Sequence, residues 1–538
     1  MKYLTNTQVS PLEAEFVETN DPLATSVSTD TLEIKEPSLL VEFENVPVDR
    51  ITEVIPKMDK LLKRIVAAGP DKFDLERIHN FIDQEVVNSL KEIENSPHLF
   101  LPDASVLDML YGEQPDHLEK FATASKLTNK FRNKNATFWL QLINSTFVNS
   151  PKVVVLGKPS SDLVRNLTDV EESRIIDQVE ALGKEGLAEK GKILEEAIES
   201  QELPGMDVLT KIPLGDVDSI QFRPFESYNR TLNAKKMFDF SQLPFKIHVE
   251  DVNSNFVQIY IFMDTTVLNR RQRKFLPLLL DLWLVSPLKK DNVVTPIEAV
   301  VKRRTKTLLH IDNGLGFSGS TFSPGAYGDA VIIEAQAEIA KFPAAIDYIG
   351  DALNFPLLSG KKVNTTTANI LNNIPSLKLS STDVLRSLSD ALYFNSSSNI
   401  HHASFLRQKV FLEQVLDDMR TDPEKIINEL YEVINKLGRP DNSFIYLATD
   451  ADQLKDVLGP QLLDLNKIFP NSDEEGADPS KLVERFELKS EYEYRRTEIG
   501  KRPRHVAFGV GGTESCFLKQ SILYNNTDWS NKEVISGS

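Results

Sequence analysis

Two stretches of this sequence share one order of apolar segments, and that order limits the possible folds more than any single motif does. Each stretch has an early strand-like run, a long helical portion and a late strand-like run. The early runs are Leu39–Phe43 and Phe245–Val249, and the late runs are Lys152–Pro159 and Asn442–Asp450. This order predicts an α+β fold in two units. The late runs also end in similar polar residues, which indicates either a faint internal repeat or two strand exits of similar chemistry.

The portions between these runs have the spacing of amphipathic helices. Apolar residues recur about one turn apart after Pro47, and Pro56 is expected to kink that helix. Asp74 is expected to cap the helix that follows, because its carboxylate can accept from backbone N–H groups of the first turn. Further helices are predicted over residues 136–147, 271–285, 297–309 and from 344 onward.

Two more strands and a charged segment complete the pattern. Phe256–Asp264 is expected to pair with Phe245–Val249 around a turn, and Asp329–Ile339 is predicted to be another strand. The segment 169–203 is rich in Glu and Lys and is interrupted by Gly183 and Gly186. We interpret it as two charged helices joined by a turn, acting as a linker between domains.

These elements predict five regions. They are a first α+β unit at 1–165, a helical linker at 166–210, a second α+β unit at 211–460, an acidic linker at 461–500 and the start of a further domain at 501–538. The last region is expected to be poorly packed, because a strand and the start of a helix have too little core of their own.

Charge and cysteine content exclude several classes of protein. A formal net charge of -18 argues against a general nucleic-acid binder, which needs a basic face. The single cysteine, Cys516, excludes an intramolecular disulfide and a cysteine zinc cluster. The first residues resemble neither a secretory signal nor a mitochondrial presequence, and Phe275–Val285 is too short to span a membrane. A cytoplasmic protein with no membrane partner is therefore expected.

No motif for catalysis or metal binding is present. A zinc peptidase needs two histidines one helical turn apart plus a carboxylate, and neither H-x-x-E-H nor H-E-x-x-H occurs among the eight scattered histidines. His401 and His402 are adjacent, so on a helix they point about 100° apart, and we interpret them as polar residues at a helix start. We assign no catalytic, cofactor-binding or metal-binding residue.

Glycine-rich and basic runs have plain structural readings. Phe508–Ser515 and Gly314–Gly325 lack the spacing or the following helix of a phosphate loop, so we interpret them as turns next to strands. The short basic runs Asn269–Lys274 and Val301–Lys306 are expected to be solvated helix faces.

Several segments resemble the pitrilysin-type (insulinase-like) zinc metallopeptidases, in particular the presequence-protease branch and its cytosolic relatives. Leu39–Ile82 is similar to the second domain of that family, and 169–203 to the helical linker between its halves. Phe256–Pro287 and Gly314–Ile349 resemble the third domain, and Phe508–Ile522 the opening of the fourth. No single segment is a sharp motif, and the resemblance depends on their common order.

The resemblance implies LuxS/metallohydrolase-like domains, each a mixed sheet covered by helices on one face. It implies that the chain is a non-catalytic portion of a peptidase that degrades unfolded peptides in a clamshell chamber. The zinc and its ligands would belong to an earlier domain, so this chain is expected to hold no zinc and to be inactive alone. The alternative is an inactive pitrilysin-like scaffold or regulatory subunit. A mitochondrial matrix location is the alternative to the cytoplasm, if a presequence precedes the chain.

Overall fold

The computed structural model describes residues 1–19, 21–32, 34, 37–114, 118, 130–201, 205, 210–211, 224–230, 237–316, 328–469, 491–494, 505–509 and 516–519. These residues belong to two compact units. One unit combines Met1–Lys152 with Glu226–Ser538, and the other is Val153–Phe225. Among the described residues, no helix combines the length and apolarity needed to cross a membrane.

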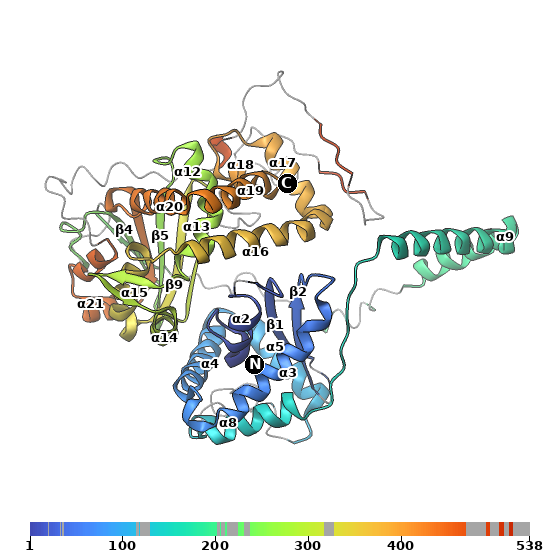
Figure 1. Cartoon of the computed structure of the whole chain (residues 1–538), viewed down its shortest axis with the longest axis horizontal. Coiled ribbons are helices and arrows are strands. Elements are labelled where there is room, and N and C mark those ends of the chain that lie inside the picture. The colour runs from blue at the N-terminus through green and yellow to red at the C-terminus, as the bar shows by residue number, and fades with distance from the viewer. Residues whose placement is uncertain are drawn as a thin grey trace. The chain divides into compact units, whose positions relative to one another are not determined.

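The first 152 residues form a small helical layer beside a two-stranded antiparallel sheet (Figure 1). Their elements are α1 (Lys2–Thr5), α2 (Pro11–Phe16), β1 (Ser26–Leu32), β2 (Ser38–Glu44), η1 (Ile51–Glu53), α3 (Val54–Ala67), η2 (Pro70–Lys72), α4 (Leu75–Asn95), α5 (Pro97–Tyr111), α8 (Ala136–Ile143) and η3 (Asn144–Val148). Their core joins α2, α3, α4 and α8, with Phe16 and Leu62 almost fully buried.

The predicted helix ends in this region are partly confirmed. Asp74 caps α4, since its carboxylate accepts from the backbone N–H of Arg77 at 3.0 Å. Pro56 was expected to kink its helix, but it lies in the first turn of α3, where a missing N–H leaves no hydrogen bond unmade. The predicted strand at Leu39–Phe43 is confirmed as part of β2, although Leu39 and Leu40 are exposed.

Glu13 of α2 gives this region a pH-dependent stability. Its carboxylate accepts from the backbone N–H of Val27 at 3.1 Å, and burial raises the pKa of Glu13 to about 6, with Glu18 raising it further and Lys362 opposing. A folded-state pKa above the unfolded value means that this residue stabilises the fold below about pH 4.5 and that the contribution is lost as pH rises through about 6.

We therefore expect Glu13→Gln to stabilise the protein at pH 7 by about 1 kcal/mol, after allowance for partial exposure. Glutamine keeps the acceptor for Val27 without the charge. The advantage, measured as the difference in thermal midpoint from the unchanged protein, should vanish near pH 4.5. Glu15→Gln on the same helix is the control, because it removes an ion pair with Arg64 and should not stabilise. A constant Glu13→Gln difference between pH 4.5 and pH 7.5 would contradict this account.

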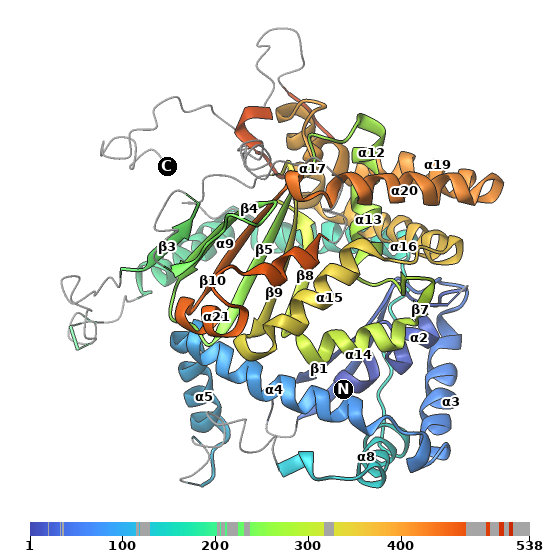
Figure 2. The same cartoon turned by 90° about the vertical axis from the view of Figure 1, so that its left-hand side faces the viewer.

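The Glu226–Ser538 part of the first unit contains a six-stranded mixed sheet in the order β3-β4-β10-β5-β9-β8. Figure 2 shows β4, β10, β5 and β9 side by side. Only β4 and β10 pair in parallel, and the other neighbours are antiparallel. The strands are β3 (Glu226–Asn229), β4 (Lys246–Asp251), β5 (Phe256–Asp264), β8 (His310–Leu315), β9 (Ala330–Glu338) and β10 (Ser443–Thr449), beside a separate pair, β6 (Leu288–Lys290) and β7 (Val293–Thr295).

The expected pairing of β4 with β5 is wrong. The late strand β10 inserts between them, so that Ile445 lies opposite Ile247 on one side and Ile261 on the other. Alternate residues of β10, including Ile445 and Leu447, are fully buried, and the central position gives this strand an apolar neighbour on both edges.

Helices pack on one face of the sheet and share a single large core with it. The helices of this region are α12 (Arg270–Lys274), α13 (Leu276–Trp283), α14 (Ile297–Thr307), η5 (Ile339–Lys341), α15 (Phe342–Asn354), α16 (Gly360–Leu379), α17 (Ser381–Tyr393), α18 (Asn399–Ala403), α19 (Phe405–Thr421), α20 (Pro423–Leu437), η6 (Pro440–Asn442), α21 (Ala451–Leu458), η7 (Leu463–Ile468) and η8 (Glu491–Tyr494). Trp283, Tyr348 and Phe342 are fully buried in that core. The α+β class predicted from the sequence is confirmed.

The second unit contains one long charged helix, α9 (Ser161–Glu199), broken at Gly183. Gly183 has φ of 58° and ψ of -174°, a conformation that glycine adopts without strain. Figure 1 shows the two helical arms on either side of this break. The predicted pair of charged helices with a turn at Gly183 is confirmed.

One predicted strand is absent, and the prediction of five regions is not tested by the structure. The predicted buried strand at Lys152–Pro159 is wrong, since Val153–Leu156 has no regular secondary structure and Val153 is 93% exposed. An apolar run forms a strand only where a neighbour pairs with it, and no described strand pairs with this run.

Most of 461–500 and much of 501–538 lie outside the described residues, and within the described parts Phe508 and Leu518 are exposed. The five predicted regions remain a prediction.

Candidate functional site

The face of the sheet opposite the large core carries aromatic and acidic side chains. One row of directly paired residues crosses all six strands: Asn229, His248, Tyr446, Tyr260, Glu334 and Asp312. A second row next to it contains Phe444, Phe262 and Ile332. We call these two rows, with the adjacent Glu250, Gln258 and Gln336, the aromatic face. Successive residues of a strand point to opposite faces of the sheet. The apolar residues that alternate with those of the aromatic face therefore lie in the large core.

Ring contacts run across the centre of the aromatic face. His248 stacks on Tyr446 with centroids 5.6 Å apart and planes 3° from parallel, and Tyr446 meets Tyr260 edge-on at 6.1 Å. In the second row Phe262 stacks on Phe444 at 5.4 Å. Lys246 Nζ lies 5.8 Å from the centre of the Phe444 ring, a distance at which a cation is attracted to the ring.

A chain of hydrogen bonds holds the β3 and β4 end of this face. Ser227 Oγ donates to Glu250 Oε2 at 2.7 Å, and His248 Nε2 lies 2.6 Å from Glu250 Oε1. His248 Nδ1 lies 3.3 Å from Asn229 Nδ2. In a serine hydrolase the histidine stands between the serine and the carboxylate, whereas here the carboxylate stands between them. The histidine therefore cannot take the Ser227 proton, and this chain of groups is not a nucleophile site.

The other end of the face has a second carboxylate with neutral donors. Gln258 Nε2 donates to Glu334 Oε1 at 2.8 Å, and the Tyr260 hydroxyl reaches the same oxygen at 3.3 Å. Burial, together with Glu250 and Tyr260, raises the pKa of Tyr446 to about 12. Burial and Glu334 also raise the pKa of Tyr260. Both phenols are therefore neutral around pH 7 and keep their hydroxyl protons.

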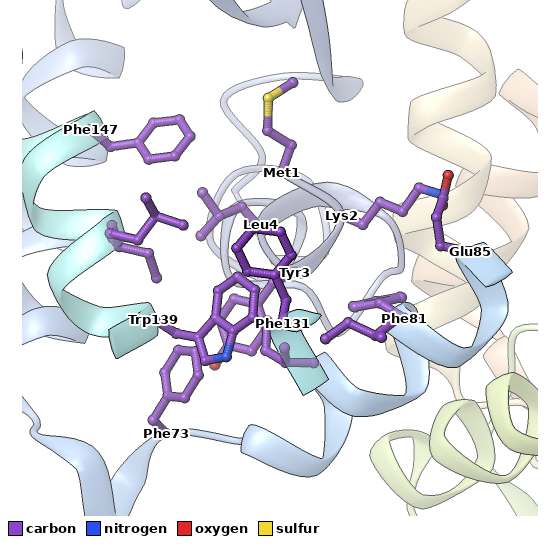
Figure 3. A pocket seen from close by; sticks show the side chains of 14 residues that line it. Met1, Lys2, Tyr3, Leu4, Phe73, Phe81, Glu85, Phe131, Trp139 and Phe147 are labelled. Carbon is purple, nitrogen blue, oxygen red and sulfur yellow. The ribbon is translucent and has the colours of Figure 1, made fainter. Parts of the chain in front are cut away.

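The structure also contains an apolar cavity of about 350 Å³ against α1, α4 and α8. Figure 3 shows its aromatic side chains, among them Tyr3, Phe81 and Trp139. Its charged lining residues are Lys2 and Glu85, which pair with each other. Besides this pair, the titratable groups of the described lining are the Tyr3 hydroxyl and the Met1 α-amino group, whose pKa is lowered by burial. The aromatic face gathers more polar and aromatic groups, and we take it as the stronger candidate site.

The residues singled out from the sequence take structural roles. His402 is buried, its Nε2 lies 2.8 Å from the Ser396 carbonyl oxygen, and burial lowers its pKa. Its ring stands at 88° to that of His401, so the two rings face different directions. Nowhere in the described residues do three His, Cys, Asp or Glu side chains gather as a metal site. Residues 317–327 and 510–515, which include most of both glycine-rich runs, lie outside the described residues.

Sequence reasoning missed the residues of the aromatic face, although a signal for them was present. In β4, β5 and β10, polar or aromatic residues alternate with aliphatic ones: His248 beside Ile247 and Val249, and Tyr446 beside Ile445 and Leu447. A period of two in a strand with one covered face marks the residues on the other face.

Comparisons with known proteins find relatives of uncharacterised function. The chain is 26% identical over 541 residues to an uncharacterised protein of Caenorhabditis elegans, covering 99% of this chain and 52% of that protein. It is 22% identical to uncharacterised proteins of Schizosaccharomyces pombe and Saccharomyces cerevisiae, covering 81% and 86% of this chain and 43% and 46% of those proteins. This chain thus spans about half the length of these relatives.

Neither the family models nor the solved structures assign this chain to a family. No family model matches it. A crystal structure of a peptidase M16 inactive domain from Pseudomonas fluorescens aligns with a TM-score of 0.31 and 11% identity, covering 41% of this chain and 49% of that chain. A TM-score that low does not establish a common fold, so nothing about this chain follows from that alignment.

Proposed function

We propose that this chain is the non-catalytic portion of a zinc metalloendopeptidase of the pitrilysin type, and that its aromatic face binds unfolded peptides. The order of segments that resemble that family supports the proposal. So does a mixed sheet with helices packed on one face and aromatic and acidic groups on the other. The aromatic face is the observation on which the peptide-binding part depends.

The chemistry of the face suits an extended peptide. Tyr446 and Tyr260 offer flat apolar surfaces with hydroxyl groups, and such side chains give large contact area at low entropic cost. Glu250 and Glu334 are acceptors for peptide N–H groups and for basic side chains. The overall charge of -18 would attract basic peptides to the protein, more strongly at low salt.

Peptide binding is tested with a fluorescent, unfolded, basic peptide of about 20 residues, followed by anisotropy. We expect Tyr446→Ala to weaken binding about tenfold, because an aromatic anchor at the centre of an interface carries one or more kcal/mol. Phe508→Ala is the control, since it removes an exposed ring elsewhere in the chain. Affinity should also fall as NaCl is raised from 50 to 300 mM. Equal binding by the protein with and without Tyr446→Ala would refute the proposed role of this face.

The alternative is that the whole protein is a catalytically inactive pitrilysin-like scaffold. The two proposals differ in whether the whole protein has a zinc site, and they give this chain the same non-catalytic role. The peptidase requires an H-x-x-E-H sequence in frame with this chain, which would supply the histidines for zinc. Its presence in a longer coding sequence, with zinc found by metal analysis of the longer protein, would favour the enzyme. A longer coding sequence without it would favour the scaffold. We propose a cytoplasmic location in either case, with the mitochondrial matrix as the alternative.

A further inference from the structure

Glu334, near the centre of the aromatic face, is a carboxylate with no Lys or Arg partner among the described residues. Glu334 accepts from two neutral groups, Gln258 and Tyr260, and no described Lys or Arg lies within 4.0 Å of its carboxylate. Glu250 differs, because His248 lies 2.6 Å from its carboxylate and forms an ion pair with it when the imidazole is protonated. Carboxylates that are half-buried or buried without a cation lose solvation that neutral donors replace only in part.

A third acceptor on the same face is buried and has no partner among the described residues. Gln336 follows Glu334 on the same side of β9 and is only 6% exposed. Its side-chain Oε1 is fully buried and no described donor reaches it. This oxygen has no accessible surface, so Glu334 beside it is the acceptor of β9 that a bound cation can reach.

Aromatic rings lie next to these acceptors. Tyr260 is directly paired with Glu334, and Tyr446 is directly paired with Tyr260. In the neighbouring row, the Lys246 ammonium group already lies over the Phe444 ring. A guanidinium group combines the properties that this set requires, because it is planar, stacks on aromatic rings and donates several hydrogen bonds in a fixed fork.

We propose that the aromatic face contains a subsite for one arginine side chain of a bound peptide. The guanidinium stacks against Tyr446 and Tyr260 and donates to the half-buried Glu334 carboxylate. A lysine ammonium supplies the charge but neither the plane nor the fork, so it binds less tightly. This inference rests on the proposed function, since it gives the side-chain preference of the same peptide-binding face.

The test uses three unfolded peptides that differ at one position, which holds arginine, lysine or citrulline. Citrulline has nearly the shape of arginine without its charge. We expect the arginine peptide to bind at least tenfold more tightly than the citrulline peptide, with the lysine peptide between them. Glu334→Gln keeps an acceptor for Gln258 and Tyr260 but removes the charge, so it should reduce the arginine-to-citrulline ratio to below threefold.

Glu298→Gln on α14 is the matched control, because it removes an exposed carboxylate from a helix of the covered side, and it should leave the ratio unchanged. If all three peptides bind equally, the arginine subsite is wrong while peptide binding stands. If the ratio is large but persists in Glu334→Gln, the charge selection comes from elsewhere and the assignment is wrong. If none of the peptides binds, the proposed function and this inference both fail.

Discussion

Replacing Gly350 with alanine should cost about 3 kcal/mol of folding stability or more, although alanine is normally the better helix former. Gly350 lies in the middle of α15, where that helix packs against η7. A Cβ atom at this position would overlap the carbonyl oxygen of Lys467 and would lie 3.3 Å from the Cα of Ile468. These are backbone atoms, so a rotamer change cannot relieve the overlap.

The surrounding packing leaves little room for η7 to move away. Asn354 Nδ2 donates to the Ile468 carbonyl oxygen at 2.8 Å and to the Gly350 carbonyl oxygen at 2.7 Å, and so ties the two elements together. Ile349 and Ile468 are fully buried beside the contact. Any shift of η7 would break these bonds or open a cavity in the core, and both outcomes are costly.

The measurement is urea unfolding followed by near-ultraviolet circular dichroism, to which the buried Trp283 contributes. The Trp283 indole donates to the Leu353 carbonyl oxygen at 2.9 Å, on the same helix as Gly350. Gly360→Ala is the control, because its nearest contact would be 3.7 Å from Met419 Cε, an ordinary van der Waals distance. We expect the control to change stability by about 0.5 kcal/mol or less. Equal effects of the two substitutions would show that the α15–η7 contact is not tightly packed.

Elements that depend on local signals could be predicted from the sequence, and those that depend on distant partners could not. The cap at Asp74 and the break at Gly183 follow from residues within one turn, and both are present. The position of β10 between β4 and β5 depends on residues about 180 to 200 positions apart along the chain, and chain proximity favoured the wrong pairing. The apolar run at Val153 looked like a strand, but strand formation needs a neighbour that sequence patterns do not reveal.

The aromatic face, too, could be predicted from the sequence only as far as local signals reach. Which residues share a face could have been predicted within each strand from the alternation of polar and apolar residues. Which residues of different strands lie side by side could not, because this requires the register. Tyr446 lies between His248 and Tyr260 only because β10 is central, so the row of rings and carboxylates became visible with the sheet order.

The basic run at Asn269–Lys274 shows how one residue of a charged segment can leave the surface. Arg273 was expected to lie on a solvated helix face, and this is wrong for that residue. Its guanidinium donates to the Ser397 carbonyl oxygen at 2.7 Å and to Asn399 Oδ1 at 3.0 Å, and lies 3.8 Å from Asp329 Oδ1. Burial lowers the pKa of Arg273, while Asp329 opposes that shift. Sequence composition cannot distinguish this arginine from its solvated neighbours.

Arg273→Met should therefore destabilise the protein by about 3–5 kcal/mol, because it leaves the buried Asp329 carboxylate without that cation and the acceptors of Ser397 and Asn399 without their donor. Urea unfolding measures the loss. Arg271→Met on the same helix is the control: Arg271 is 42% exposed and pairs with Glu429 at 2.8 Å, so its removal should cost about 1 kcal/mol or less.

A double-mutant cycle identifies the source of the loss. If the lost attraction between Arg273 and Asp329 causes it, adding Asp329→Asn to Arg273→Met should recover about 1–3 kcal/mol, because the second change removes the buried charge that the arginine had stabilised. If lost packing of the arginine side chain causes it, the second substitution recovers nothing and the two costs add. We expect recovery, since Asp329 lies within 4 Å of the guanidinium and both side chains are 8% exposed. Additive costs would mean that Arg273 stabilises the α12–α18 region through its packing and its contacts with Ser397 and Asn399, and not through Asp329.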